Sequence, residues 1–135
     1  MVFYGEYEGT MTEGGRVALP KKIREVLHGS QIVITRGFGN CLAGYDKHDW
    51  EKRAEDLITV SLLEKEHIDK RRLLFSSTVY VDLDEQGRMI IPKPLQTSAG
   101  IQKKVVISGV GDHFEVWSQE AWNQYITKLQ QDGAL

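Results

Sequence analysis

The sequence contains the same segment twice. When it is shifted by 72 residues against itself, nine positions between Thr10 and Arg53 are identical without a gap. The identical pairs are Glu13/Glu85, Gly15/Gly87, Arg16/Arg88, Pro20/Pro92, Lys21/Lys93, Val33/Val105, Gly37/Gly109, Gly39/Gly111 and Trp50/Trp122. The fold must therefore consist of two copies of one supersecondary unit together with a spacer.

The composition is typical of a globular intracellular protein. A chain of 135 residues with 41% hydrophobic and 27% charged residues can bury a core, which excludes wholesale disorder. The single cysteine, Cys41, excludes an intrachain disulfide and a CxxC motif, and it favours a reducing compartment. No apolar run approaches the ~18 residues of a membrane span, and the acidic N-terminus does not resemble a signal peptide. We therefore expect a cytoplasmic protein with no membrane partner.

Each copy is predicted to fold as strand, strand, short helix, strand, strand. In the first copy the strands are expected within Tyr4–Thr12 and at Val17–Leu19, Gln31–Thr35 and Cys41–Tyr45. A glycine turn separates the first two strands, a proline opens the short helix, and the sequence GFGN forms the last hairpin. The corresponding strands of the second copy are Thr78–Asp84, Met89–Ile91, Lys104–Ser108 and His113–Trp117.

A longer helix is predicted to close each copy. Asp46 and Ser118 are N-cap residue types, and apolar stripes that include Trp50 and Trp122 follow them. These aromatic residues are expected to pack on the β-structure or on a neighbouring subunit, with a ligand pocket as the alternative. The spacer Val60–Ser77 is also predicted to be helical.

These elements divide the chain into three parts. Residues 1–53 form the first repeat and the start of its closing helix, residues 54–77 form a helical spacer that turns near Ser61, and residues 78–135 form the second repeat with its closing helix. A repeat without its helix has only about 45 residues, which is marginal for independent folding. The two repeats are therefore predicted to share one core as an interlocked unit.

The repeated motif carries a family resemblance. The runs GRVALPKKIREVL and GRMIIPKPLQTSAG resemble SpoVT/AbrB-type regulators, in which a D-x-x-x-R motif precedes an isoleucine- or valine-proline-helix segment. The opening G-E-Y, the run T-R-G-x-x-x-C-L and the run G-V-G-x-x-F-E-V-W further resemble the MraZ family over essentially the whole chain.

This resemblance implies a fold, a location and a function. The implied fold is β-rich α+β, a swapped-hairpin double-split β-barrel formed by the two tandem repeats with flanking helices. The implied function is sequence-specific DNA binding by a cytoplasmic, nucleoid-associated transcriptional regulator of the division and cell-wall gene cluster. The resemblance also implies a ring-shaped homo-oligomer that binds repeated promoter motifs in double-stranded DNA.

The two copies of the motif differ from the family pattern in different ways. The second copy has the complete motif from Asp84 to Arg88, whereas the first has Thr12 in place of the aspartate. The first copy has Arg24 in its helix, whereas the second has Gln96 at that place. Each copy therefore keeps its glycine-arginine pair and lacks one accessory group, which leaves the equivalence of the two half-sites open.

Positive charge is concentrated around these motifs. The chain has a formal net charge of −2, so any DNA binding must come from a local patch. The segment from Arg16 to Arg36 carries a net charge of +4, the segment from Asp84 to Lys104 carries +2, and the segment from Asp112 to Leu135 carries −3. The first repeat is therefore predicted to make more of the phosphate contacts. A solvated basic face without a ligand is the alternative.

The candidate DNA-binding residues follow from this pattern. Arginine can reach guanine O6 and N7 in the major groove, so Arg16 and Arg88 are predicted to read bases. Cations at a glycine turn and a helix start suit phosphate contacts. The residues assigned to that role are Lys21, Lys22, Arg24 and Lys93. The supporting motif residues are Thr12, Gly15, Asp84 and Gly87.

Asp84 has two possible roles that the sequence does not separate. Its carboxylate could orient the Arg88 guanidinium through charge-assisted hydrogen bonds. Alternatively, it could cap the N–H groups of the turn, which is a purely structural role. Thr12 could perform only the uncharged version of either role.

The sequence offers no catalytic constellation. The run Asp82-x-Asp84-x-Gln86-Gly87 begins like a calcium loop, but lysine stands at the twelfth position, where glutamate is required. The four histidines have no metal-ligand spacing, and Cys41 is expected to be a small buried residue rather than a nucleophile. We therefore expect neither an enzyme nor a cofactor or metal. The alternative function is a protein-interaction module, an antitoxin-like barrel whose main partner is another protein.

Overall fold

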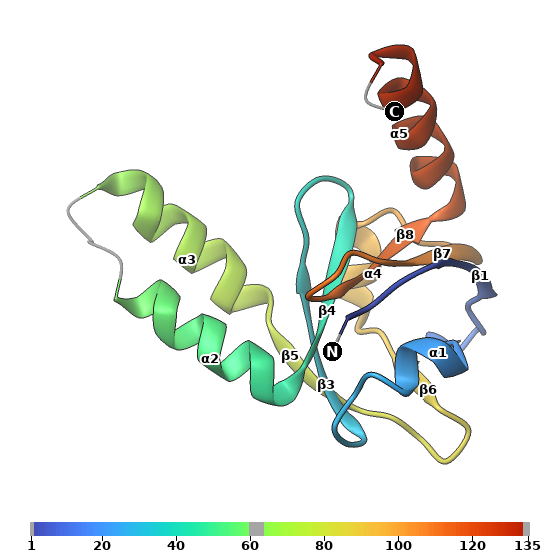
Figure 1. Cartoon of the computed structure of the whole chain (residues 1–135), viewed down its shortest axis with the longest axis horizontal. Helices are drawn as coiled ribbons and strands as arrows, with labels where there is room; N and C mark the ends of the chain where they lie inside the picture. Colours follow the sequence, from blue (N-terminus) through green and yellow to red (C-terminus); the bar gives the residue numbers. More distant parts are fainter. Residues whose placement is uncertain (1, 60–63, 134–135) are drawn as a thin grey trace.

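The computed structural model describes residues 2–59 and 64–133, and in them it confirms an α+β fold with two repeats (Figure 1). The first repeat contributes β1 (Glu6–Thr10), β2 (Arg16–Ala18), α1 (Lys21–Arg24), β3 (Gln31–Arg36), β4 (Cys41–Asp46) and α2 (Lys47–Ile58). A further helix, α3 (Lys65–Ser77), precedes the second repeat. The second repeat contributes β5 (Val79–Asp82), β6 (Arg88–Ile90), α4 (Lys93–Ser98), β7 (Lys104–Gly109), β8 (Phe114–Ser118) and α5 (Gln119–Gln131). Each repeat thus follows the predicted order of elements, and the turn expected near Ser61 lies outside the described residues.

Strands of the two repeats alternate within the sheets. The larger sheet is antiparallel with the order β1-β7-β8-β4-β3-β5, and the smaller sheet pairs β2 with β6. The first strand of each repeat therefore pairs with the third strand of the other, and the two second strands pair with each other. Since these bonds satisfy backbone groups that a single repeat would leave open, the repeats depend on each other for their strand pairing.

The pairings within the described residues give two open sheets and no closed barrel. The mostly antiparallel α+β architecture is thus confirmed. The swapped-hairpin double-split β-barrel stays a prediction at this level of detail.

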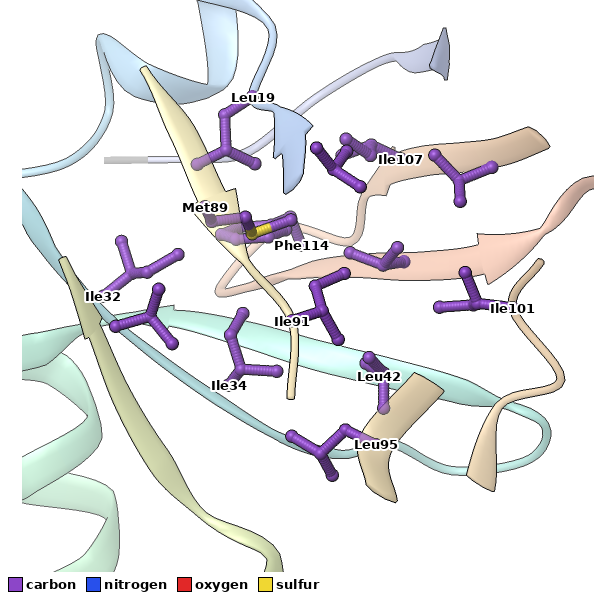
Figure 2. Packing of buried hydrophobic residues seen from close by; sticks show 14 of the residues in the cluster. Leu19, Ile32, Ile34, Leu42, Met89, Ile91, Leu95, Ile101, Ile107 and Phe114 are labelled. Carbon is purple, nitrogen blue, oxygen red and sulfur yellow. The ribbon is translucent and has the colours of Figure 1, made fainter. Parts of the chain in front are cut away.

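The main core lies between the two sheets (Figure 2). Val17 of β2 and Met89 of β6 are fully buried and face inward against residues of the large sheet such as Ile34 and Phe114. Strand β3 has four consecutive buried residues, Ile32 to Thr35, because the sheet is covered on both faces. One face meets the core, and helices pack on the other.

The ends of α2, α3 and α5 contact the second face of the large sheet, and the helices extend away from it (Figure 1). The hydroxyl of Thr35 on β3 donates to the carbonyl of Leu74 on α3 at 3.1 Å. Trp50 of α2 is buried, and the centroid of its ring lies 5.2 Å from that of Tyr45. The ring centroids of Trp122 on α5 and Trp117 lie 5.6 Å apart. The predicted packing of these aromatic residues on the β-structure is therefore confirmed.

The ungapped alignment of the repeats is wrong by one residue in the third strand. Ile32 pairs with Asp46 and Val105 pairs with Ser118, and these two partners are equivalent residues at the starts of α2 and α5. Ile32, not Val33, is thus the counterpart of Val105, and both face the core. The cause is a difference in hairpin length. The Gly37 N–H donates to the Cys41 carbonyl four residues later, whereas the Val110 N–H donates to the His113 carbonyl three residues later.

The closing helices begin after Asp46 and Ser118, as predicted, but only Ser118 caps its helix with a side-chain hydrogen bond. The Ser118 hydroxyl accepts a hydrogen bond from the Ala121 N–H at 3.1 Å, as an N-cap does. The Asp46 carboxylate instead accepts the backbone N–H of His28 at 2.9 Å and contacts its ring nitrogen at 3.3 Å. Asp46 thus ties the start of α2 to the segment after α1.

A substitution at Gly44 tests the packing of the large sheet. A Cβ added at Gly44 would overlap the ring of Phe114, which is fully buried. We expect Gly44→Ala to lower the free energy of unfolding by about 1–3 kcal/mol, the usual cost of overpacking a core. Gly29→Ala is the control, because no heavy atom lies within 4 Å of its added Cβ. Equal urea midpoints for the two variants would contradict the packing.

Candidate nucleic-acid interface

The β2–β6 ribbon brings the two candidate base-reading arginines onto one surface. Arg16 pairs with Ile90, and Ala18 pairs with Arg88, on either side of the central Val17–Met89 pair. Because side chains alternate along a strand, the central pair points into the core and the other four point outward. Both arginines are half-buried, while Ile90 is 48% exposed. Two residues 72 positions apart in the sequence thus share the outer face of one ribbon.

The turn before β6 is organised by one carboxylate. Asp84 Oδ1 accepts the backbone N–H groups of Gln86 and Arg88, each at 2.9 Å. Asp84 Oδ2 accepts the Arg88 Nε–H at 2.8 Å. The two roles considered for Asp84 are therefore not alternatives, since one oxygen caps the turn and the other orients the guanidinium.

The turn before β2 has the same backbone hydrogen bond as the turn before β6 but fewer side-chain hydrogen bonds. The Gly15 N–H donates to the Thr12 carbonyl at 3.0 Å, as the Gly87 N–H donates to the Asp84 carbonyl at 2.9 Å. The Thr12 hydroxyl accepts only the backbone N–H of Arg16, at 3.2 Å. Thr12 therefore performs the uncharged capping role and leaves the Arg16 guanidinium without a carboxylate partner at this turn.

Each turn is held by the other repeat. The Gly87 carbonyl accepts the N–H of Leu19 at 3.0 Å, and the Gly15 carbonyl accepts the N–H of Ile91 at 2.9 Å. Both glycines are buried and have positive φ, +77° at Gly15 and +74° at Gly87, which side chains strongly disfavour. The glycines of the motif are therefore required by the turn and by the close approach of the second repeat.

The predicted phosphate-contacting residues are all exposed, but Arg24 differs from the three lysines in that a hydrogen bond holds its side chain. Lys21, Lys22 and Lys93 are exposed at the starts of α1 and α4, directly after the ribbon strands. Arg24 is exposed but anchored, since its Nε–H donates to the Leu19 carbonyl at 3.1 Å. Its side chain lies against Gly87 of the other repeat, not against the turn of its own repeat.

Two further residues belong to the candidate interface and are not among the site residues that the sequence predicts. Gln96 stands where the first repeat has Arg24; it is 8% exposed, and its Nε2 donates to the Ile91 carbonyl at 2.7 Å. Ile90 contributes an exposed apolar side chain to the outer face of the ribbon. The strand alternation around Arg88 would have identified Ile90, whereas Gln96 depends on a contact between the repeats.

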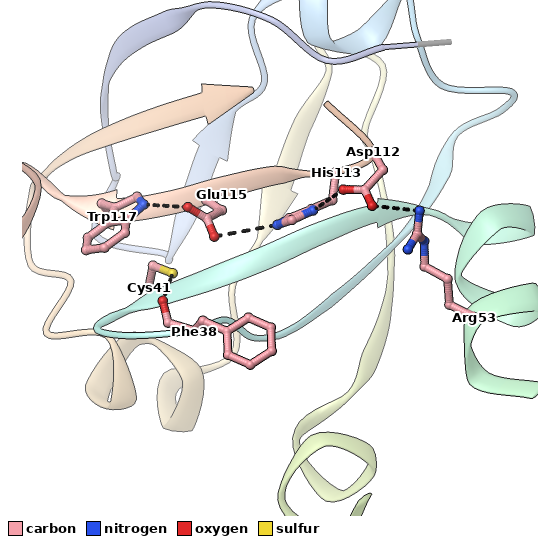
Figure 3. Close-up of polar contacts among 7 residues, drawn as sticks. All are labelled: Phe38, Cys41, Arg53, Asp112, His113, Glu115 and Trp117. Atoms are coloured by element: carbon pink, nitrogen blue, oxygen red, sulfur yellow. Dashed lines mark hydrogen bonds and ion pairs between the residues drawn. The ribbon is translucent and has the colours of Figure 1, made fainter. Parts of the chain in front are cut away.

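A second polar cluster lies on the face of the large sheet opposite the core (Figure 3). His113 contacts Asp112 at 2.7 Å and Glu115 at 3.5 Å, and Asp112 pairs with Arg53 of α2 at 2.8 Å. Burial lowers the pKa of His113, but hydrogen bonds to Glu115 and Asp112 outweigh it and raise that pKa. These contacts join the β7–β8 hairpin to α2.

Cys41 lies beside this cluster and is buried. Burial, followed by the charge of Glu115, raises the pKa of its thiol to about 12. This agrees with a small buried residue and not with an activated nucleophile. Among the described residues, no group of three or more His, Cys, Asp and Glu is placed to hold a metal ion. In the same part of the chain, no helix has both the length and the apolar character needed to span a membrane.

Known proteins match the chain over nearly its whole length. A family model described as "MraZ protein, putative antitoxin-like" matches residues 2–73 and again residues 74–134. A transcriptional regulator MraZ from Roseiflexus castenholzii is 36% identical over 134 residues, which cover 99% of this chain and 93% of the relative. The protein of the same name from Ligilactobacillus salivarius is 37% identical, with 97% and 91% covered. That from Caldanaerobacter subterraneus is 39% identical, with 90% and 84% covered.

The pKa of Asp84 tests the turn. Hydrogen bonds from the Arg88 backbone and guanidinium, and from the Gln86 N–H, hold this pKa below its ordinary value of 3.8. The carboxylate thus stabilises the folded turn above the ordinary pKa, and this stabilisation is lost as pH falls through the lowered one. In an NMR carboxyl titration, Arg88→Ala should raise the pKa only partly, because the backbone N–H groups remain. Arg16→Ala should leave it unchanged, and an equal shift in both variants would contradict the assignment.

Proposed function

The chain belongs to the MraZ family, and we propose that it regulates transcription by binding specific sequences in double-stranded DNA through the β2–β6 ribbon. One observation carries this proposal: Arg16 and Arg88 share the outer face of a two-stranded ribbon. The major groove of B-DNA admits such a ribbon, and arginine is the commonest specific partner of guanine there.

The supporting groups have distinct roles in this proposal. Asp84 holds the Arg88 Nε–H, which leaves the terminal nitrogens of the guanidinium available for a bidentate contact with guanine O6 and N7. Lys21, Lys22 and Lys93 contact phosphates on either side of the ribbon, and Arg24 adds a further cation. The lysine contacts fix the register of the protein on the duplex without reading sequence.

The target and the location follow from the family resemblance. The proposed target is the promoter of the division and cell-wall gene cluster, and the protein is proposed to be cytoplasmic and associated with the nucleoid. No step of this function requires catalysis or a cofactor.

Binding is proposed to require assembly. One ribbon presents few cations, and the net charge of −2 gives no long-range attraction to DNA. A ring-shaped homo-oligomer that engages several short promoter motifs together can raise apparent affinity by ~10²–10⁴. The proposed subunit contacts are apolar side chains of the helices. Leu73 is 53% exposed and Tyr125 is 44% exposed, Leu74 is half-buried beside Thr35, and Leu62 lies outside the described residues.

A protein-interaction module is the second candidate. Phe38, at the tip of the β3–β4 hairpin, is 92% exposed, and Tyr4 is 72% exposed. Exposed aromatic side chains of this kind suit a protein partner. If this were the main activity, replacing the arginines of the ribbon or the lysines beside it would not change the preference for one DNA sequence over another.

The salt dependence of DNA binding tests the phosphate contacts. Gel shifts with the upstream region of the gene and with a scrambled duplex should first show preference for the former. Replacing Lys21 and Lys22 by Ala should then reduce the slope of log affinity against log salt by about 0.9 for each lost phosphate contact. Lys128→Ala, on α5, is the control and should leave the slope unchanged. Equal slopes for all three proteins would contradict the assignment.

The dependence on assembly can be tested at Leu73. Leu73→Glu should split the ring into smaller species, because a charge cannot be buried at an apolar contact without a partner. Light scattering reports the size, and circular dichroism should show an intact fold, since the two repeats pair within one chain. Thr127→Glu adds the same charge at an exposed polar position of α5 and should leave the ring intact. Smaller species that bind a multi-motif promoter as tightly as the ring would refute this requirement.

A further inference from the structure

Arg24 supports the turn of the second repeat, although it belongs to the first. A Cβ added at Gly87 would lie 2.6 Å from Arg24 Cδ and 2.8 Å from Arg24 Cζ, so the guanidinium lies directly against the Asp84–Arg88 turn. Two hydrogen bonds through Leu19 connect Arg24 to this turn. Arg24 Nε donates to the Leu19 carbonyl at 3.1 Å, and the Leu19 N–H donates to the Gly87 carbonyl at 3.0 Å.

Gln96 occupies the equivalent place at the turn of the first repeat. Its Nε2 donates to the Ile91 carbonyl at 2.7 Å, and a Cβ added at Gly15 would lie 2.8 Å from the same nitrogen. The Ile91 N–H donates in turn to the Gly15 carbonyl at 2.9 Å. The amide thus reproduces the structural contact of Arg24 but supplies no charge and is almost fully buried.

The two departures from the motif therefore fall on the same turn. In the sequence, the first repeat lacks the aspartate and the second lacks the helix arginine. In the fold, the turn of the second repeat has both groups, since Asp84 binds Arg88 and Arg24 lies against Gly87. The turn of the first repeat has neither, because Thr12 binds the Arg16 N–H and Gln96 lies against Gly15.

We propose that the chain has one complete base-reading turn, formed by Asp84, Arg88 and Arg24, and one depleted turn, at Arg16, that contacts only the phosphate backbone. This inference rests on the proposed function. Asp84 restricts the Arg88 guanidinium before DNA arrives, so less conformational entropy is lost when the bidentate base contact forms. Arg16 has no such restriction from its turn. Each chain therefore specifies one short asymmetric element, not an inverted pair.

Discrimination between duplexes tests this asymmetry. Fluorescence anisotropy should be measured with the upstream duplex and with its scrambled form. Arg88→Ala should reduce the ratio of the two affinities about 5- to 150-fold, the range for one lost bidentate base contact. Arg16→Ala should weaken both duplexes by the same factor and leave the ratio unchanged. Arg24→Gln copies the amide of Gln96, so the fold is kept, and it should lower the ratio as well.

A transfer variant provides the converse test. Thr12→Asp combined with Gln96→Arg rebuilds the missing groups at the first turn, and in this background Arg16→Ala should reduce the ratio. Asp84→Thr combined with Arg24→Gln depletes the second turn and should abolish the dependence of the ratio on Arg88. Urea unfolding and circular dichroism should show that each variant remains folded.

The outcomes separate the two proposals. A wild-type protein that binds the upstream and scrambled duplexes equally would contradict the proposed function itself. A discriminating wild type whose ratio falls as much with Arg16→Ala as with Arg88→Ala would overturn only the asymmetry of the turns. Discrimination that depends on Arg88 alone, and moves to Arg16 in the rebuilt variant, supports both.

Discussion

The position of the two motif turns depends on two backbone hydrogen bonds between the repeats, in which the Leu19 N–H donates to the Gly87 carbonyl and the Ile91 N–H donates to the Gly15 carbonyl. They extend the β2–β6 pairing into the turns, and this pairing directs Val17 and Met89 into the core and the arginines outward. The glycines cannot be replaced without displacing the Arg24 or Gln96 side chain that lies against them. At each turn, the glycine, the side chain of Arg24 or Gln96 that lies against it, and the outward arginine therefore hold their positions together.

Much of the local structure was predictable because its signals are local. The repeat, the order of elements, the glycine turns and the helix starts after Asp46 and Ser118 all come from short sequence patterns. The choice of strand partners was not predictable, since the pairing of β1 with β7 and of β3 with β5 joins residues far apart in the chain. The one-residue shift in the third strand was hidden by a coincidental identity, Val33 with Val105.

The same limit applies to the site. The residues of the motif were identifiable, but their grouping was not, because the net charge of a continuous segment does not show contacts that cross between the repeats. Arg24 adds to the positive charge of the first repeat in the sequence and to the turn of the second repeat in space. The sequence offers turn capping and guanidinium orientation as alternative roles of Asp84, but an ionised carboxylate has two oxygens and several acceptor positions. In the fold both oxygens are used.

The arrangement of layers separates the ribbon from the helices. The inward face of β2–β6 packs on one face of the large sheet through Val17 and Met89, whereas the ends of α2, α3 and α5 contact the opposite face. A contact between subunits through the exposed apolar residues of these helices would thus leave both turns accessible. It would also keep each ribbon rigidly placed, because the large sheet connects the two layers. In the proposed assembly, rigid placement would let several weak ribbons act on one duplex, since the spacing of the subunits would then fix the spacing of the DNA elements.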